Sequence, residues 1–201
     1  MLVLYSASPI DRPRNGRGIT GQMFVRAVRE AYNLSLPHAY FVAYSSLLLL
    51  GKTKVDLGQL AAHNHIEHDA SLIHANANGH PFAPTSNDPA LVQKLLEEVE
   101  VAGGLGVDEI AFARVRRERS VGEGTQIDFL HRQIALGEAS IALLIFMDET
   151  GKMPLETVRS WLIGGRLPEG WVPTRSGRFI DTAKIAKRVT DKMNQIIAGA
   201  R

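Results

Sequence analysis

The chain has 201 residues, 45% of them hydrophobic, which is enough for one well-filled core, so we expect a single domain. Its formal net charge is +2 and its basic and acidic residues are interspersed, so composition gives no indication of a nucleic-acid or membrane partner. There is no cysteine, which excludes disulfides. The apolar N-terminus, residues 1–5, is too short and lacks the basic leader of a signal peptide, so export is not predicted and localisation stays open.

The first part of the chain predicts a loop followed by helices. Residues 1–18 are expected to be irregular, because 6–18 combine two prolines, two glycines and four charges, and residues 19–201 form the helical domain. Thr20 can cap a helix that ends at Tyr32. After a break at Pro37, residues 38–50 are apolar on all sides, which favours a core helix.

The rest of the chain continues the helical pattern, with almost no strand signal. A capping box at Asp56 predicts a helix that runs towards a histidine cluster, and Arg114 to Arg117 are expected on a solvated helix face. The other helices are predicted at residues 89–102, at 109–119, at 126–136 with Thr125 as cap, at 139–147, at 154–163 and around Ile185, Val189, Met193 and Ile197. The fold class is therefore mostly α.

Polar side chains are concentrated at residues 63–74, which hold four of the seven histidines. Glu67 and Ser71 are four residues apart, so on a helix both oxygens would point the same way and suit a hard cation together with a carbonyl. His68 would project from another side of the turn. A polar helix end with solvated histidines is the alternative interpretation.

Glu138 is the one ionisable side chain between residues 134 and 147. Such a lone carboxylate either lies on a solvated stripe of its helix or is buried with a raised pKa that equips it for proton transfer. The residues alone leave both alternatives open.

The segment from Glu67 to Leu72 (Glu-His-Asp-Ala-Ser-Leu) resembles the Glu-His-Asp-x-Ser segment of the fungal haem-thiolate peroxidases, the chloroperoxidase and unspecific peroxygenase family. Three further segments resemble that family in order and spacing: residues 13–20, Gly137-Glu138 followed by Gly151-x-x-Pro154, and Arg166-Leu167-Pro168 before Gly170-Trp171. The resemblance spans residues 13–173 and implies a single compact helical domain of the chloroperoxidase type.

The resemblance also implies a function and a site. It implies a haem enzyme that uses hydrogen peroxide to oxidise halide or a small organic substrate, with Glu138 as acid–base and His68 orienting it. It implies a Mg or Mn ion held by Glu67, Ser71 and the carbonyl of His68. His131 falls where the longer peroxygenases carry an arginine, although a helix-surface histidine is the simpler interpretation. Oligomeric state is left open.

One element of the family pattern has no counterpart in the chain. The resemblance implies an axial cysteine in a Pro-Cys-Pro segment about thirteen residues before Pro13, at or just before Met1. Either the sequence starts inside a longer protein, or the chain has lost the ligand and kept the scaffold. Members of the family are often secreted, whereas no signal peptide is predicted here.

Two other functions are compatible with the residues. A non-catalytic helical scaffold that has lost haem ligation follows from the absent cysteine. A metallohydrolase follows from His63-x-His65-x-Glu67-His68, which resembles a zinc motif of the metallo-β-lactamase fold. That motif should follow a strand, whereas a capped helix is predicted before it.

Overall fold

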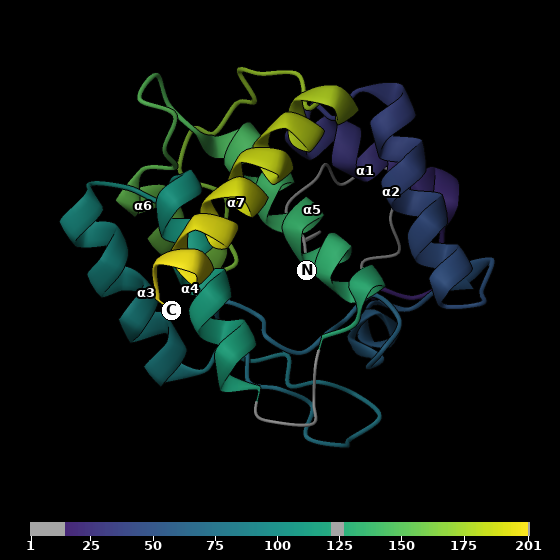
Figure 1. Ribbon diagram of the computed structural model, residues 1–201. Coiled ribbons are helices and arrows are strands. Elements are labelled where there is room, and N and C mark those ends of the chain that lie inside the picture. The colour runs from purple at the N-terminus through teal and green to yellow at the C-terminus, as the bar shows by residue number, and fades with distance from the viewer. Residues whose placement is uncertain (1–14, 122–126, 201) are drawn as a thin grey trace.

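The computed structural model describes residues 15–121 and 127–200, and their architecture is mostly helical, as predicted (Figure 1). The predicted irregular segment 1–18 lies largely outside the described residues. The elements in chain order are β1 (Ile19–Thr20), α1 (Gly21–Tyr32), α2 (Leu36–Leu49), β2 (Lys54–Val55), η2 (Leu57–Ala61), α3 (Pro89–Ala102), α4 (Val107–Ser120), α5 (Phe129–Phe146), α6 (Leu155–Thr157), η3 (Val158–Ile163) and α7 (Phe179–Gly199).

Helices α1 and α2 pack against each other next to a two-residue antiparallel pair, β1 with β2. Thr20 caps α1 as predicted, because its hydroxyl accepts the Met23 backbone N–H at 3.3 Å. Two expectations for α2 were wrong. Pro37 does not break the chain before α2 but lies in its first turn, where the missing N–H of proline removes no hydrogen bond. The helix is also not buried on all sides, because one apolar face, which includes Phe41, is exposed.

Helix α7 packs on both α4 and α5, and Figure 1 shows it running alongside them. The buried face of α7 carries Ile185, Val189 and Met193, which confirms the predicted amphipathic pattern for these three positions. Trp171 anchors the segment before α7, because its indole N–H donates to the Ala31 carbonyl at 3.2 Å and its ring packs on Phe146.

Helix α5 is a single helix through Gly137, whereas the sequence suggested two segments that meet there. Its cap is Asp128, whose side chain accepts the His131 N–H; the predicted cap Thr125 and first residue Gln126 lie outside the described residues. By length and composition α5 could span a membrane, but half of it is buried inside the protein. It is therefore the central core helix.

The arginines of α4 do not form the solvated face that was predicted. Arg114 is 1% exposed and Arg117 is 7% exposed. Their guanidinium groups turn towards the long segment between η2 and α3, where they donate to backbone carbonyls. Burial lowers the pKa of both guanidinium groups, and this effect outweighs the charge of nearby acidic residues, which raises the pKa. These arginines connect α4 to the histidine-rich segment.

Candidate functional site

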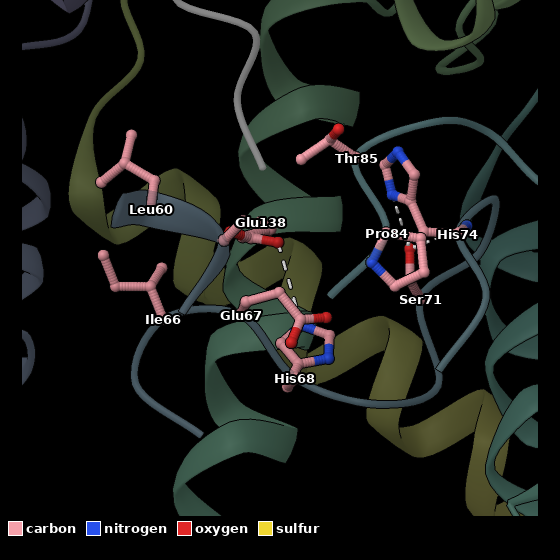
Figure 2. Close-up of a pocket in the computed structure, with 10 residues that line it drawn as sticks. Leu60, Ile66, Glu67, His68, Ser71, His74, Pro84, Thr85 and Glu138 are labelled. Atoms are coloured by element: carbon pink, nitrogen blue, oxygen red, sulfur yellow. Dashed lines mark hydrogen bonds and ion pairs between the residues drawn. The ribbon is translucent and has the colours of Figure 1, made fainter. Parts of the chain in front are cut away.

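The histidine-rich segment is irregular and not helical, because η2 ends at Ala61. The predicted capping box is present, with the Asp56 N–H donating to Gln59 Oε1, but it starts only a short 3₁₀ turn. The prediction that Glu67 and Ser71 share a helix face is therefore wrong. Both side chains nevertheless line the same small cavity, of about 60 Å³, with His68 and Glu138 (Figure 2).

A larger cavity of about 550 Å³ adjoins this site and runs along one face of α5. Four α5 residues at helical spacing line it: Ala135, Glu138, Ala139 and Ala142. The three alanines leave room beside the carboxylate, because a methyl is the smallest side chain available there. Apolar walls come from Leu72 and Ile73 on the histidine-rich segment and from Trp161, Leu162 and Ile163 on η3.

The imidazole of His68 faces the carboxylate of Glu138 across this cavity, with Nε2 3.9 Å from Oε2 (Figure 2). That distance is an ion-pair contact and is too long for a direct hydrogen bond. The other ring nitrogen, Nδ1, lies 2.7 Å from the Asp69 carbonyl oxygen. Because a carbonyl can only accept, Nδ1 carries a hydrogen and Nε2 is left to face Glu138.

Glu138 lies on the cavity side of α5, with 28% of its side chain exposed. Burial raises its pKa, but the positive charge of neighbouring groups, His68 among them, outweighs burial, so the pKa lies below the ordinary value of a glutamate. The expected alternative of a raised pKa is therefore wrong, although the cavity-facing placement is the one observed. The ionised carboxylate of Glu138 therefore faces Nε2 of His68 at ion-pair distance and without a direct hydrogen bond.

The two side-chain ligands proposed for a cation are engaged by neighbouring histidines. Glu67 Oε2 lies 2.8 Å from His63 Nδ1, and Ser71 Oγ lies 3.3 Å from the backbone N–H of His74, from which it accepts. No group of three or more His, Cys, Asp or Glu side chains within residues 15–121 and 127–200 is placed to hold a metal ion. A Mg or Mn ion here stays a prediction.

The four residues of the metallohydrolase motif do not converge on one point. His63 contacts Glu67, His65 Nδ1 lies 3.0 Å from the Leu49 carbonyl oxygen, and His68 faces Glu138. In the part of the chain that the structure describes, the motif follows a 3₁₀ turn and not a strand. This arrangement does not resemble a shared zinc centre.

Among the cavity-lining residues that were not identified from the sequence as site residues are His74, Arg114 and Trp161. The pKa of His74 is lowered, chiefly by burial. Only the density of histidines around His68 could have indicated His74. The expected surface residue His131 is instead 7% exposed and lies 2.6 Å from the carboxylate of Asp128. It therefore contacts the cap of α5 and does not lie on the helix surface.

Comparison with known proteins gives one match at family level. A family model described as "Peroxidase, family 2" matches residues 13–176. A search of curated proteins found no match. The matched residues include the histidine-rich segment, all of α5 and the cavity wall contributed by η3.

Proposed function

Because the chain belongs to peroxidase family 2, the haem-thiolate chloroperoxidase family, we propose that it binds haem in the 550 Å³ cavity and uses hydrogen peroxide to oxidise halide or a small organic molecule. The observation that carries the proposal is the convergence of His68 and Glu138 on one cavity. Family membership supports a peroxidase-type oxidoreductase. The cofactor, the substrate and the residue roles are the proposed part.

The cavity fits a haem in two respects and fails in one. Its volume lies within the roughly 300–1,000 Å³ of ligand pockets, and its walls are mostly apolar. Leu72 and Ile73 on one side and Ala139 and Ala142 on the other would contact the macrocycle. The 201 residues contain no cysteine, so none of them can supply the thiolate expected from the family.

When bound, haem would supply the redox chemistry of peroxide reduction. The part assigned to this chain is proton transfer. Glu138 is ionised and oriented towards the cavity, so it can accept a proton from a substrate there and return it to a leaving oxygen. His68 would orient the carboxylate through the contact of Nε2 with Oε2. Because its pKa is low, Glu138 alone is a weak base. The proposed role therefore requires that the pKa of Glu138 rises when substrate fills the cavity.

Glu67, Ser71 and the His68 carbonyl are proposed as the cation ligands. Supporting this, Glu67 and Ser71 line one small cavity next to the larger one. Each would have to exchange its histidine contact for the ion, because Glu67 Oε2 and Ser71 Oγ are both engaged. A cation carries more charge than either histidine contact, which would favour that exchange.

The test is a haem titration of the full chain followed by peroxide turnover, with wild type, Glu138→Gln and Glu149→Gln compared. We expect saturation at one haem per chain in all three proteins and loss of turnover in Glu138→Gln alone, because Glu149 is exposed and lies beyond the end of α5, outside the lining of both cavities. Equal turnover in Glu138→Gln and wild type would refute the acid–base role. No saturable haem binding would instead support the non-catalytic scaffold.

The carbon monoxide spectrum of the haem-loaded chain separates two forms of ligation. Because the chain has no cysteine, we expect it to lack the red-shifted absorption band of a thiolate-ligated haem. A thiolate-type band from this chain alone would contradict the account of its ligands.

A further inference from the structure

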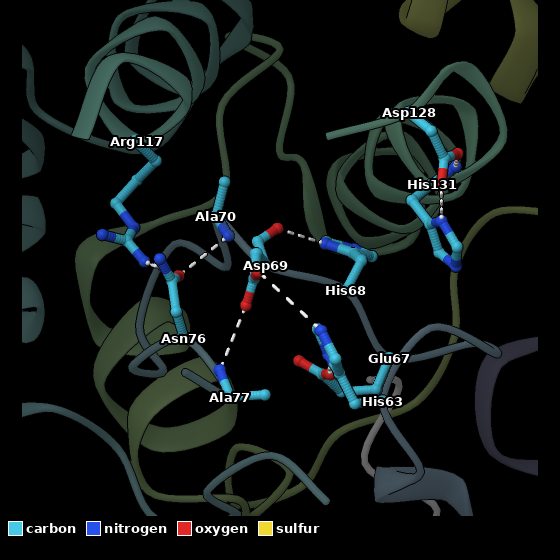
Figure 3. Close-up of polar contacts among 10 residues, drawn as sticks. All are labelled: His63, Glu67, His68, Asp69, Ala70, Asn76, Ala77, Arg117, Asp128 and His131. Carbon is cyan, nitrogen blue, oxygen red and sulfur yellow. Dashed lines mark hydrogen bonds and ion pairs between the residues drawn. The ribbon is translucent and has the colours of Figure 1, made fainter. Parts of the chain in front are cut away.

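The peptide unit between Asp69 and Ala70 is held at both of its polar ends. Its carbonyl oxygen accepts from His68 Nδ1 at 2.7 Å, and its N–H donates to Asn76 Oδ1 at 3.0 Å (Figure 3). Because a peptide is planar, fixing the N–H direction also fixes the direction of the carbonyl. The orientation of the His68 ring therefore depends on the position of Asn76.

Asn76 is itself held by a buried cation from another element. Arg117 on α4 donates from Nη2 to Asn76 Oδ1 at 2.8 Å (Figure 3). It also donates from Nε to the Ser71 carbonyl at 2.6 Å. The same oxygen of Asn76 thus accepts from Arg117 and from Ala70. The bond from the charged guanidinium is the stronger kind and holds the Asn76 amide in the position that receives the Ala70 N–H.

Ala70 adopts a backbone conformation that needs such support. Its φ is +62°, in the left-handed region, which is unfavourable for a residue with a Cβ because the Cβ comes too close to the following carbonyl oxygen. Asn76 holds its N–H, and Arg114 Nη1 donates to its carbonyl at 2.9 Å. Strain at a residue next to a candidate site, held by buried side chains, is typical of an imposed geometry.

We propose that Asn76, held by Arg117, is a positioning residue that fixes the hydrogen of His68 on Nδ1 and so turns Nε2 towards Glu138. It acts through the Asp69–Ala70 peptide and does not touch the reacting groups. This inference rests on the proposed function for its catalytic meaning, but the ring orientation can be measured without haem or peroxide.

The experiment is ¹⁵N NMR of the full chain labelled at histidine, recorded at pH 8.5, where an ordinary imidazole is neutral. The two ring nitrogens report which of them carries the hydrogen, and the His68 signals are assigned by their loss in His68→Gln. Wild type should show hydrogen on Nδ1. Asn76→Asp should match it, because the carboxylate keeps both acceptor contacts. Asn76→Ala should lower the ratio of the Nδ1–H to the Nε2–H form by about fivefold, the effect of one hydrogen bond.

The matched pair separates positioning from stability. If Asn76→Ala lowers the stability of the fold but leaves the ratio of the Nδ1–H to the Nε2–H form of His68 unchanged, Asn76 is only structural and the proposal is wrong. Should Asn76→Ala not fold, Arg117→Lys decides: it keeps the charge but loses the forked geometry, so we expect an intermediate ratio, and a wild-type ratio would overturn the proposal. Failure of haem binding or turnover would leave these results unaffected and would bear on the proposed function alone.

Discussion

His68 and Glu138 are seventy positions apart in the sequence, yet Nε2 of one lies 3.9 Å from Oε2 of the other. One residue comes from an irregular segment and the other from the central helix α5. Each is turned to the contact by its own support: the Asp69 carbonyl for His68, and the small-residue face of α5 for Glu138. The pair is therefore built by tertiary structure and not by local spacing.

The charge of Glu138 should make stability depend on pH in a defined direction. Its pKa is lower in the folded chain than in the unfolded chain, so its ionised form stabilises the fold above the unfolded value of about 4.3. That contribution is lost as pH falls through the folded pKa. We expect the stability difference between wild type and Glu138→Gln to be constant above about pH 5.5 and to shrink on acidification. The total loss should be about 1.4 kcal/mol for each unit by which folding lowers the pKa of Glu138.

Urea unfolding from pH 3 to pH 8 measures this difference. Glu149→Gln is the control, because that side chain is exposed and should show little pH-dependent difference from wild type. A gap between wild type and Glu138→Gln that widens as pH falls would mean that the pKa of Glu138 is raised.

The left-handed backbone of Ala70 predicts an unusual response to glycine. Ala70→Gly should change the unfolding free energy by less than about 0.5 kcal/mol, because relief of the strain at φ +62° offsets the lost methyl and the greater freedom of the unfolded chain. Ala70→Val should cost about 2 kcal/mol, since a β-branched residue tolerates this conformation poorly. Chemical unfolding of both variants measures these values.

Ala39 is the matched control for Ala70. It is equally buried, at 0% exposed, but lies inside helix α2. Ala39→Gly should destabilise by about 1 kcal/mol through helix propensity alone, with lost packing in addition. Equal costs for Ala39→Gly and Ala70→Gly would contradict the strain at Ala70.

The helices could be predicted from the sequence because their signals are local. Thr20 as a cap, Asp88-Pro89 as a start and the four-residue spacing of Ile185, Val189 and Met193 all act within a few residues. Whether Glu138 faces solvent or a cavity could not be decided in this way, because the run from residue 134 to 147 has no other ionisable side chain to mark a solvated face. Only the packing of other elements determines which face of α5 meets a cavity.

For the arginines of α4, the local sequence pattern predicted solvent exposure, and the prediction was wrong. A run of cations predicts a solvated face, since burying a charge without a partner is costly. Arg114 and Arg117 are buried because the irregular segment, which lacks helical hydrogen bonds, offers them backbone carbonyls. That match between spare acceptors and buried donors joins residues more than forty positions apart, and no local pattern encodes it.

Filling the cavity should separate haem binding from stability. Ala139 lines the 550 Å³ cavity from α5, so in Ala139→Phe the ring would occupy space proposed for the macrocycle. We expect haem affinity to fall at least tenfold while the unfolding free energy changes by less than about 1 kcal/mol, because the added ring enters a void and not a packed core. Absorbance titration with haem and urea unfolding measure the two quantities. Ala90→Phe, at an exposed position of α3, should bind haem like wild type.

The cation proposal predicts weak binding of Mn²⁺ to the chain without haem. Only one carboxylate, that of Glu67, is among the proposed ligands, and it is already in contact with His63, so we expect a dissociation constant of roughly 10⁻⁴–10⁻³ M, the range of weak oxygen sites. Glu67→Gln should weaken binding at least tenfold by removing the charge, and Ser71→Ala should weaken it less, because a neutral ligand is lost. Electron paramagnetic resonance of free Mn²⁺ during a titration measures the affinity. Glu156→Gln on α6 serves as the control, and binding that responds equally to Glu156→Gln and Glu67→Gln would exclude a cation at Glu67 and Ser71.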